Sequence, residues 1–141
     1  MAYKIVKERK AWWPVSWKGV GEDGEIITNK IELRFRLLKV DEAVKIALAV
    51  DGVRAAEATP TGDGSDPATV AAAIAALPVR YADLVMQIAD DWRGVQAENG
   101  EPLPFGADNL ALLMNEPGLF GHVFEAFRDC INAREEAKAG N

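Results

Sequence analysis

Cysteine, histidine and long apolar runs are scarce in this 141-residue sequence, and each scarcity excludes a class of site or structure. Cys130 is the single cysteine, which excludes an internal disulfide and a cysteine-based zinc site. It falls within a helical apolar pattern, which is typical of an inert, partly buried thiol, because a reactive thiolate needs an electropositive setting. His122 is the single histidine, so we expect a solvated helical residue rather than a ligand in a transition-metal site.

The longest apolar run is short and is interrupted by Lys45, so the sequence predicts no transmembrane span. Residues 1–10 are too charged for a signal peptide, and we therefore expect a cytoplasmic protein. The net charge of -6 and the pI of about 4.8 argue against nucleic-acid binding, which needs a basic surface. With 49% hydrophobic residues, the chain fits one domain, 1–141, that buries about 70% of its unfolded surface.

Alternating polarity predicts an antiparallel sheet within residues 3–40. Residues 3–7 are expected to form a short strand, and a second strand is expected from Trp13. Pro14 restricts that strand to an edge or a bulge, because proline has no N–H to donate. After a predicted hairpin turn at residues 22–24, apolar and polar residues alternate along the third strand. Its apolar face holds Ile27, Ile31, Leu33, Phe35 and Leu37.

The period becomes helical at Asp41, a predicted N-cap, and the expected helix covers 41–57 with Val44, Ala47 and Leu48 on its apolar face. Residues 58–66 contain few apolar side chains and are predicted to form a flexible loop. Asp66 followed by Pro67 is a strong helix start for a helical part at 67–138. The predicted fold class is α+β: a small N-terminal antiparallel sheet of about three strands, then a C-terminal cluster of four to five helices.

Two apolar stripes with helical spacing predict core helices within the helical part, after a break at Pro78. The first stripe consists of Tyr81, Leu84, Val85, Ile88 and Trp92. Pro117 is expected to open the last helix, whose stripe consists of Phe120, Val123, Phe124, Phe127 and Ile131. The tail from Arg134 is polar and is expected to fray.

The stretch between these helices predicts an elbow. Glycine at 94 lets the chain leave a helix in a left-handed conformation, and Asn99-Gly100 is typical of a turn. Pro102 and Pro104 favour extended backbone before Phe105, which becomes an apolar anchor. Gly106 is a suitable N-cap for a short apolar helix. The structural residues of this elbow are Trp92, Gly94, Gly100, Pro102, Phe105, Leu110 and Leu113.

The elbow sequence resembles a pattern found in the C-terminal half of tail assembly chaperones from long-tailed bacteriophages and prophages. The matching residues are Trp92, Gly94, Val95, Gly100, Pro102, Phe105, Asn109, Leu110, Leu112 and Leu113. The sequence departs from the pattern at Gly106-Ala107, where family members often carry a Ser or Thr cap followed by proline.

The resemblance implies a non-catalytic protein that binds the tape-measure protein and helps tail-tube subunits to assemble around it. It also implies self-association, location in the host cytoplasm, and absence from the finished virion. In this family a ribosomal frameshift makes a minor, longer product, which requires an accessible chain end. A structural tail or head-tail completion protein, which stays in the virion, is the alternative.

No stretch of the sequence predicts catalysis or cofactor binding. Residues 63–66 lack the twelve-residue ligand pattern of a calcium loop, and residues 19–21 lack the strand-to-helix context of a phosphate-binding glycine loop. Asp90 and Asp91 are adjacent, so they do not share a helical face, and a solvated pair is expected. Ser16 and Ser65 have no local histidine. A small enzyme with a site assembled from scattered residues is a further alternative.

Three indoles crowd the second predicted strand. Trp13 and Trp17 share one face of that strand, and Trp12 points to the other. One interpretation is a sheet core with one indole on its rim. The other is a protein-binding surface formed by Trp12, Trp13 and Trp17, because aromatic residues are enriched where interfaces carry binding energy.

Overall fold

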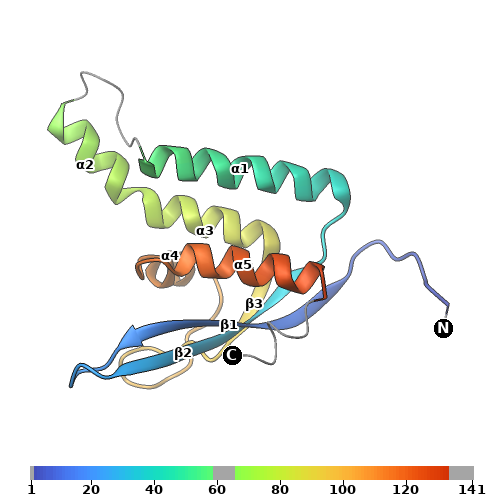
Figure 1. The fold of residues 1–141 in the computed structure, drawn as a ribbon, viewed down its shortest axis with the longest axis horizontal. Coiled ribbons are helices and arrows are strands. Elements are labelled where there is room, and N and C mark those ends of the chain that lie inside the picture. Colours follow the sequence, from blue (N-terminus) through green and yellow to red (C-terminus); the bar gives the residue numbers. More distant parts are fainter. Residues whose placement is uncertain (1, 59–65, 134–141) are drawn as a thin grey trace.

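The computed structural model describes residues 2–58 and 66–133. Within these ranges, three strands form one antiparallel sheet in the order β1-β2-β3, and five helices accompany it. Figure 1 shows the helices on one side of the sheet, with α5 (Leu119–Ile131) beside it and α1 (Val40–Ala58) farthest away. The predicted α+β class, a small antiparallel sheet followed by a cluster of helices, is confirmed.

The first two strands form a long hairpin. β1 (Lys10–Val20) pairs with β2 (Ile26–Arg36) from Lys10↔Arg36 to Val20↔Ile26. Gly24 has φ +83° in the connecting turn, as expected for the glycine of the predicted Glu-Asp-Gly turn. β1 is an edge strand, so the position predicted from Pro14 is confirmed. Residues 3–7 form no strand, because their side chains are exposed on both sides and cover no core.

The third strand comes from a stretch that was expected to be helical. α3 (Leu77–Ile88) is followed directly by β3 (Ala89–Arg93), which pairs with β2 and places Trp92 opposite Leu33 and Ala89 opposite Phe35. The prediction of a helix through Trp92 is therefore wrong. Trp92 lies four residues after Ile88, a spacing that is also typical of a helical stripe. Pairing of this segment with β2, which is distant in sequence, decides the structure instead.

A bulge in β3 explains why Ala89 and Trp92 are both buried although they are three residues apart. The register shifts between Arg34 and Phe35, so Asp90 has no partner of its own on β2. One extra residue changes the side-chain alternation, and both Ala89 and Trp92 then face the core.

The outermost helix, α1 (Val40–Ala58), begins one residue before Asp41, which lies in its first turn rather than at the N-cap. The core side is formed by Ile46, Val50 and Val53. Val44 and Leu48 are exposed, so the predicted buried face is wrong. Because apolar residues occur on both sides of this helix, periodicity could not identify the face that packs on the core.

α2 (Pro67–Ala75) starts as predicted, since Asp66 Oδ1 accepts a hydrogen bond of 2.7 Å from the Thr69 N–H. This bond to the backbone of Thr69 lowers the pKa of Asp66 below its usual value. The predicted break is also confirmed, because α2 ends at Ala75 and α3 (Leu77–Ile88) starts with Pro78 in its first turn. Most of the expected flexible loop, 59–65, lies outside the described residues.

The helical run Pro67–Ile88 is long and apolar enough, by length and composition alone, to cross a membrane. The prediction of no transmembrane span did not take account of this run, in which alanine carries much of the hydropathy. A single run of this kind is weak evidence for a membrane span. Its apolar window is 17% buried inside the protein, and α2 contains no buried residue.

The last two helices follow the elbow. α4 (Ala107–Met114) has Gly106 at its N-cap, as predicted. α5 (Leu119–Ile131) begins after Gly118, whose φ is +79°, so Pro117 lies in the preceding turn instead of opening the helix. Residues 134–141, the predicted fraying tail, lie outside the described residues.

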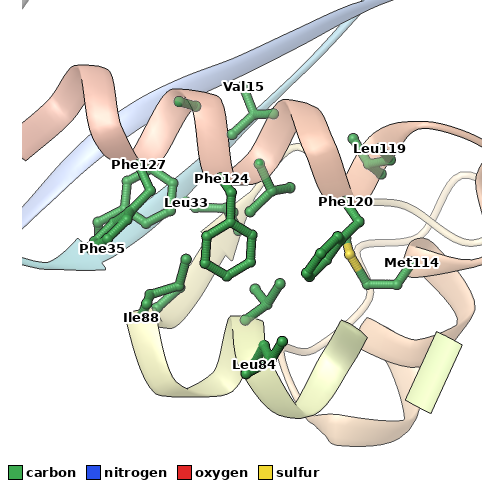
Figure 2. Packing of buried hydrophobic residues seen from close by; sticks show 14 of the residues in the cluster. Val15, Leu33, Phe35, Leu84, Ile88, Met114, Leu119, Phe120, Phe124 and Phe127 are labelled. Carbon is green, nitrogen blue, oxygen red and sulfur yellow. The ribbon is translucent and has the colours of Figure 1, made fainter. Parts of the chain in front are cut away.

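The core lies between α5, α3 and the sheet. Figure 2 shows Phe120, Phe124 and Phe127 of α5 directed toward α3 and the sheet. The rings of Phe35 and Phe127 meet edge-on with centroids 5.4 Å apart. All predicted stripe residues of α5 are buried except Ile131, which is exposed, while Cys130 joins the buried set.

Candidate functional site

The elbow is a small hairpin, and the side chain of Trp92 in β3 connects it to the sheet. Its two arms meet in a bridge between Gln96 and Pro102, and Gly100 has φ +87° at the turn. The Trp92 indole N–H donates a hydrogen bond of 2.8 Å to the Leu103 carbonyl. The Phe105 ring lies edge-on to this indole at 5.3 Å and 89°.

The short helix α4 is attached to this elbow. Asn109 Nδ2 donates a hydrogen bond of 2.9 Å to the Pro104 carbonyl. Leu110 is buried, and Leu113 and Phe105 are half-buried. Trp92, Leu103 and Phe105 thus meet across the elbow, with Trp92 approaching from a strand. Several of the matching residues therefore hold the elbow together by contacts with one another. Leu112 alone among the matching leucines is exposed.

The three N-terminal indoles do not form one continuous surface. Trp13 is buried in the core, and Trp17 is half-buried against it. Trp12 lies on the opposite face of β1, where the guanidinium carbons of Arg93 and Arg34 lie 3.6 Å and 5.7 Å from its ring centroid. Of the three predicted binding residues, Trp12 is thus the one placed away from the core.

A charged cluster surrounds Trp12 on the outer face of the sheet. The bulged residue Asp90 makes ion pairs of 2.6 Å with both Lys10 Nζ and Arg34 Nε, and its side chain is only 13% exposed. Burial alone raises the pKa of Asp90, but hydrogen bonds from Arg34 and Lys10 outweigh it and hold the pKa below the usual value. The expected solvated pair at Asp90 and Asp91 is therefore wrong for Asp90. The cluster fastens all three strands together.

A polar hollow of about 260 Å³ brings together residues that the sequence analysis kept apart. Ser16 of β1 and His122 of α5 both line it, together with Glu125 and Asp129. The buried Ser16 hydroxyl makes no hydrogen bond within the described chain. A nucleophile and its base need hydrogen-bond contact of about 2.6–3.2 Å, so this hollow holds no assembled Ser–His pair. The described residues also contain no group of three or more metal-ligating side chains.

A hollow of about 440 Å³ lies where α1, the α2–α3 junction and the α4–α5 connection meet. The Tyr81 ring stacks on Phe120 at 4.2 Å, and its hydroxyl donates a hydrogen bond to Glu57 of α1. These contacts tie the C-terminal end of α1 to the core helices.

An apolar groove of about 310 Å³ runs between α1 and α5. Its lining consists of Ala43, Ile46, Ala47, Val50, Asp51, Arg54, Phe124, Phe127, Arg128, Ile131 and Asn132. The sequence analysis placed Phe124 and Phe127 in the core but did not anticipate a groove above them. The spacing of Ile46, Val50 and Val53 could have indicated the core side of α1 and the groove beside it. Val44 and Leu48 form a second apolar set on the same helix and obscured this signal.

A second set of apolar residues is exposed on the outward side of α1. Val40, Val44 and Leu48 follow one another at intervals of four, and they are 81%, 54% and 66% exposed. We call the groove and these three residues the α1 surface. A helix that is apolar on both sides is normally buried on both sides, so this surface has the composition of an interface.

Comparison with known protein families, curated proteins and solved structures finds no match to this chain.

Proposed function

We propose that this protein is a non-catalytic binding protein that holds an apolar helical segment of its partner on the α1 surface. The observation that carries the proposal is the exposure of Val40, Val44 and Leu48 on a helix whose other side already packs on the core. Burying each large apolar side chain stabilises a complex by about 1.5–3 kcal/mol before the costs of association.

The groove gives this surface the shape for a helix. A partner helix laid along it would place side chains spaced by three and four residues over Ile46 and Val50, as in other helix-in-groove complexes. Arg54 and Arg128 line the two sides of the groove, with Asp51 beside them. These charges favour a partner helix with acidic residues flanking its apolar stripe.

The resemblance of the elbow to tail assembly chaperones suggests which partner this is. We infer that the chain is a phage tail assembly chaperone, that the occupant of the α1 surface is a helical segment of the tape-measure protein, and that tail-tube subunits assemble on the resulting complex. The α1 surface replaces the three indoles as the proposed docking site, because Trp13 and Trp17 pack against the core.

Co-purification from cells that express both proteins tests the binding proposal. Val44→Glu is expected to abolish capture of the tape-measure protein, because it puts a charge into the apolar contact. Val79→Glu on α3 is a matched control, because Val79 is 55% exposed and lies outside the α1 surface. Equal capture by both variants would place the docking site elsewhere.

Two observations separate a chaperone from a structural protein of the tail. Mass spectrometry of purified virions should not detect the chain if it is a chaperone, and its presence would favour the structural alternative. The gene should carry a slippery heptamer near its end, followed by an overlapping frame and a tape-measure gene. A gene without these features would remove the frameshift product and make the structural reading the first choice.

A further inference from the structure

The outer face of the sheet, on the side away from the helices in Figure 1, differs in charge from the chain as a whole. Direct partners on neighbouring strands share a face, so this face holds the even-numbered residues of β1 and β2, with Asp91 and Arg93 of β3. Its fully exposed charged side chains are all basic, namely Lys10, Lys18, Lys30 and Arg93. Because the chain has a net charge of -6, this face is a basic region on an acidic protein.

The two ends of this face differ in whether their positive charges are neutralised within the chain. At one end, Asp90 makes ion pairs of 2.6 Å with Lys10 Nζ and Arg34 Nε. Toward the hairpin turn, Lys30 and Arg93 make no ion pair with any of the described residues. The positive charge that is available to a partner therefore lies at Lys30 and Arg93.

The guanidinium of Arg93 is positioned by Trp12. Its carbon lies 3.6 Å from the centroid of the indole ring, which is a close cation–π contact. Glu32 is the direct partner of Arg93 on β2, yet the two side chains make no ion pair. Within the described part of the chain, the N–H groups of this guanidinium have no hydrogen-bond acceptor. A planar guanidinium that is held by stacking and keeps its donors free is pre-organised to bind a carboxylate with two parallel hydrogen bonds.

Lys30 lies close enough to Arg93 for one ligand to contact both. Lys30 is two residues from Glu32 along β2, so it is the diagonal neighbour of Arg93, at about 7–8 Å between Cα atoms. A Cβ placed on Gly94 would lie 3.7 Å from the Lys30 carbonyl oxygen, which shows that the end of β3 runs beside this residue. Alternate residues of an extended segment are also about 7 Å apart. Carboxylates at alternate positions of such a segment therefore match the two cations.

The limited length of the basic region selects the kind of partner. Beyond it, the hairpin turn carries Glu22, Asp23 and Glu25, and in the other direction Asp90 has already neutralised its neighbours. A nucleic-acid strand needs a continuous basic surface, and its phosphates would meet the acidic turn. A protein segment with two or three carboxylates is short enough to end before the turn. Charge complementarity thus favours an acidic protein segment.

We propose that the outer face of the sheet binds an acidic, extended segment of a partner protein. One carboxylate of the segment accepts two hydrogen bonds from the Arg93 guanidinium, and the next carboxylate on the same side accepts one from Lys30 Nζ. The helices lie on the other side of the sheet, so this site and the α1 surface can be occupied at the same time. The inference rests on the charges of the sheet and is independent of the function proposed above.

An NMR titration of the isotopically labelled full chain tests this site with a defined probe. The probe is a synthetic peptide in which glutamate and serine alternate. It should shift the signals of the Trp12 indole N–H and the Arg93 side-chain N–H, and added salt should weaken the effect. The same peptide with glutamine in place of glutamate should cause no shift. Absence of shifts at both residues with the glutamate peptide, or equal shifts with the glutamine peptide, would overturn the proposal.

Matched variants test the two cations. Arg93→Ala should raise the dissociation constant of the glutamate peptide about fivefold, because one charged contact at an exposed site is lost. Arg80→Ala on α3 removes the same charge from an exposed residue away from the sheet and should leave the constant within about twofold. Arg93→Lys should give an intermediate value, since it keeps the charge but loses the planar fork. Lys30→Ala serves as the second variant if circular dichroism shows that Arg93→Ala does not fold. Unchanged affinity in Arg93→Ala and Lys30→Ala would overturn the proposal.

A second titration distinguishes an acidic protein segment from a nucleic acid. Oligothymidylate with the same number of negative charges as the peptide should bind more weakly than the peptide. Tighter binding of the oligonucleotide, lost in Arg93→Ala, would overturn the protein-segment proposal in favour of single-stranded nucleic acid. Val44→Glu should leave peptide binding unchanged, so a failure of the α1 surface and a failure of this site give different results.

Discussion

α1 and α5 border the same groove, yet they differ in how their apolar residues are arranged and buried. In α5 the apolar residues form one stripe, and nearly all of it is buried against the sheet and α3. In α1 the apolar residues are distributed around the helix, so Ile46, Val50 and Val53 are buried while Val40, Val44 and Leu48 remain exposed. The arrangement of apolar residues around a helix, more than their number, therefore decides whether the helix stabilises its own domain only.

The largest effect should come from the buried ring of α5. Phe127→Ala removes a ring that packs edge-on against Phe35 and also contacts Phe124, and we expect a loss of about 3–5 kcal/mol in the free energy of unfolding. Urea unfolding followed by circular dichroism measures this loss. A loss below about 1 kcal/mol would show that α5 does not anchor the core.

A core-facing residue of α1 should matter less. Ile46→Ala is expected to cost about 2 kcal/mol, at the low end for such changes, because Ile46 borders the open groove and solvent can fill part of the space. The same urea titration applies. A cost equal to that of Phe127→Ala would mean that both helices are equally part of the core.

Asp90 belongs to neither helix, and its ion pairs lie on the outer face of the sheet. Because the pKa of Asp90 is held below its usual value in the folded protein, its contribution is present above the unfolded pKa of about 4 and is lost as pH falls through the folded pKa. Asp90→Asn should therefore cost about 1 kcal/mol at pH 7 and should reduce the loss of stability below pH 4. Unfolding curves of parent and variant from pH 7 to pH 2.5 provide the measurement. Parallel pH profiles would contradict this role of the outer face.

The smallest effect should be on the outward side of α1. Leu48→Ala removes an exposed side chain, and the free energy of unfolding of the isolated chain should change by less than about 0.5 kcal/mol. The same variant should weaken capture of a helical partner. If Leu48→Ala destabilised the isolated chain as strongly as Ile46→Ala, the outward face would already be occupied within the protein.

Much of the fold could be predicted because local patterns agreed with the final packing. The alternation of Ile31, Leu33 and Phe35 gave β2, Asp66-Pro67 gave the start of α2, and the phenylalanine stripe gave α5. These signals sit within a few residues of the structure that they specify. The opposite placement of Trp12 and Trp13 also follows from strand alternation.

The errors concern features that distant residues decide. Ala89–Arg93 continues a helical spacing, and its pairing with Leu33 and Phe35 lies outside any local window. The bulge that turns Asp90 toward Lys10 and Arg34 has no local sequence signal. Two apolar sets on α1 left its buried side undetermined. The candidate surface therefore became visible only when the structure showed which of the two sets is already used.

The origin of β3 also sets the order in which the sheet can form. Three helices separate β3 from β2 along the chain, so the ribosome has already released the complete hairpin, α1, α2 and α3 when Ala89–Arg93 emerges. Until then β3 cannot cover its edge of β2, so the sheet is completed only after the first three helices have been made.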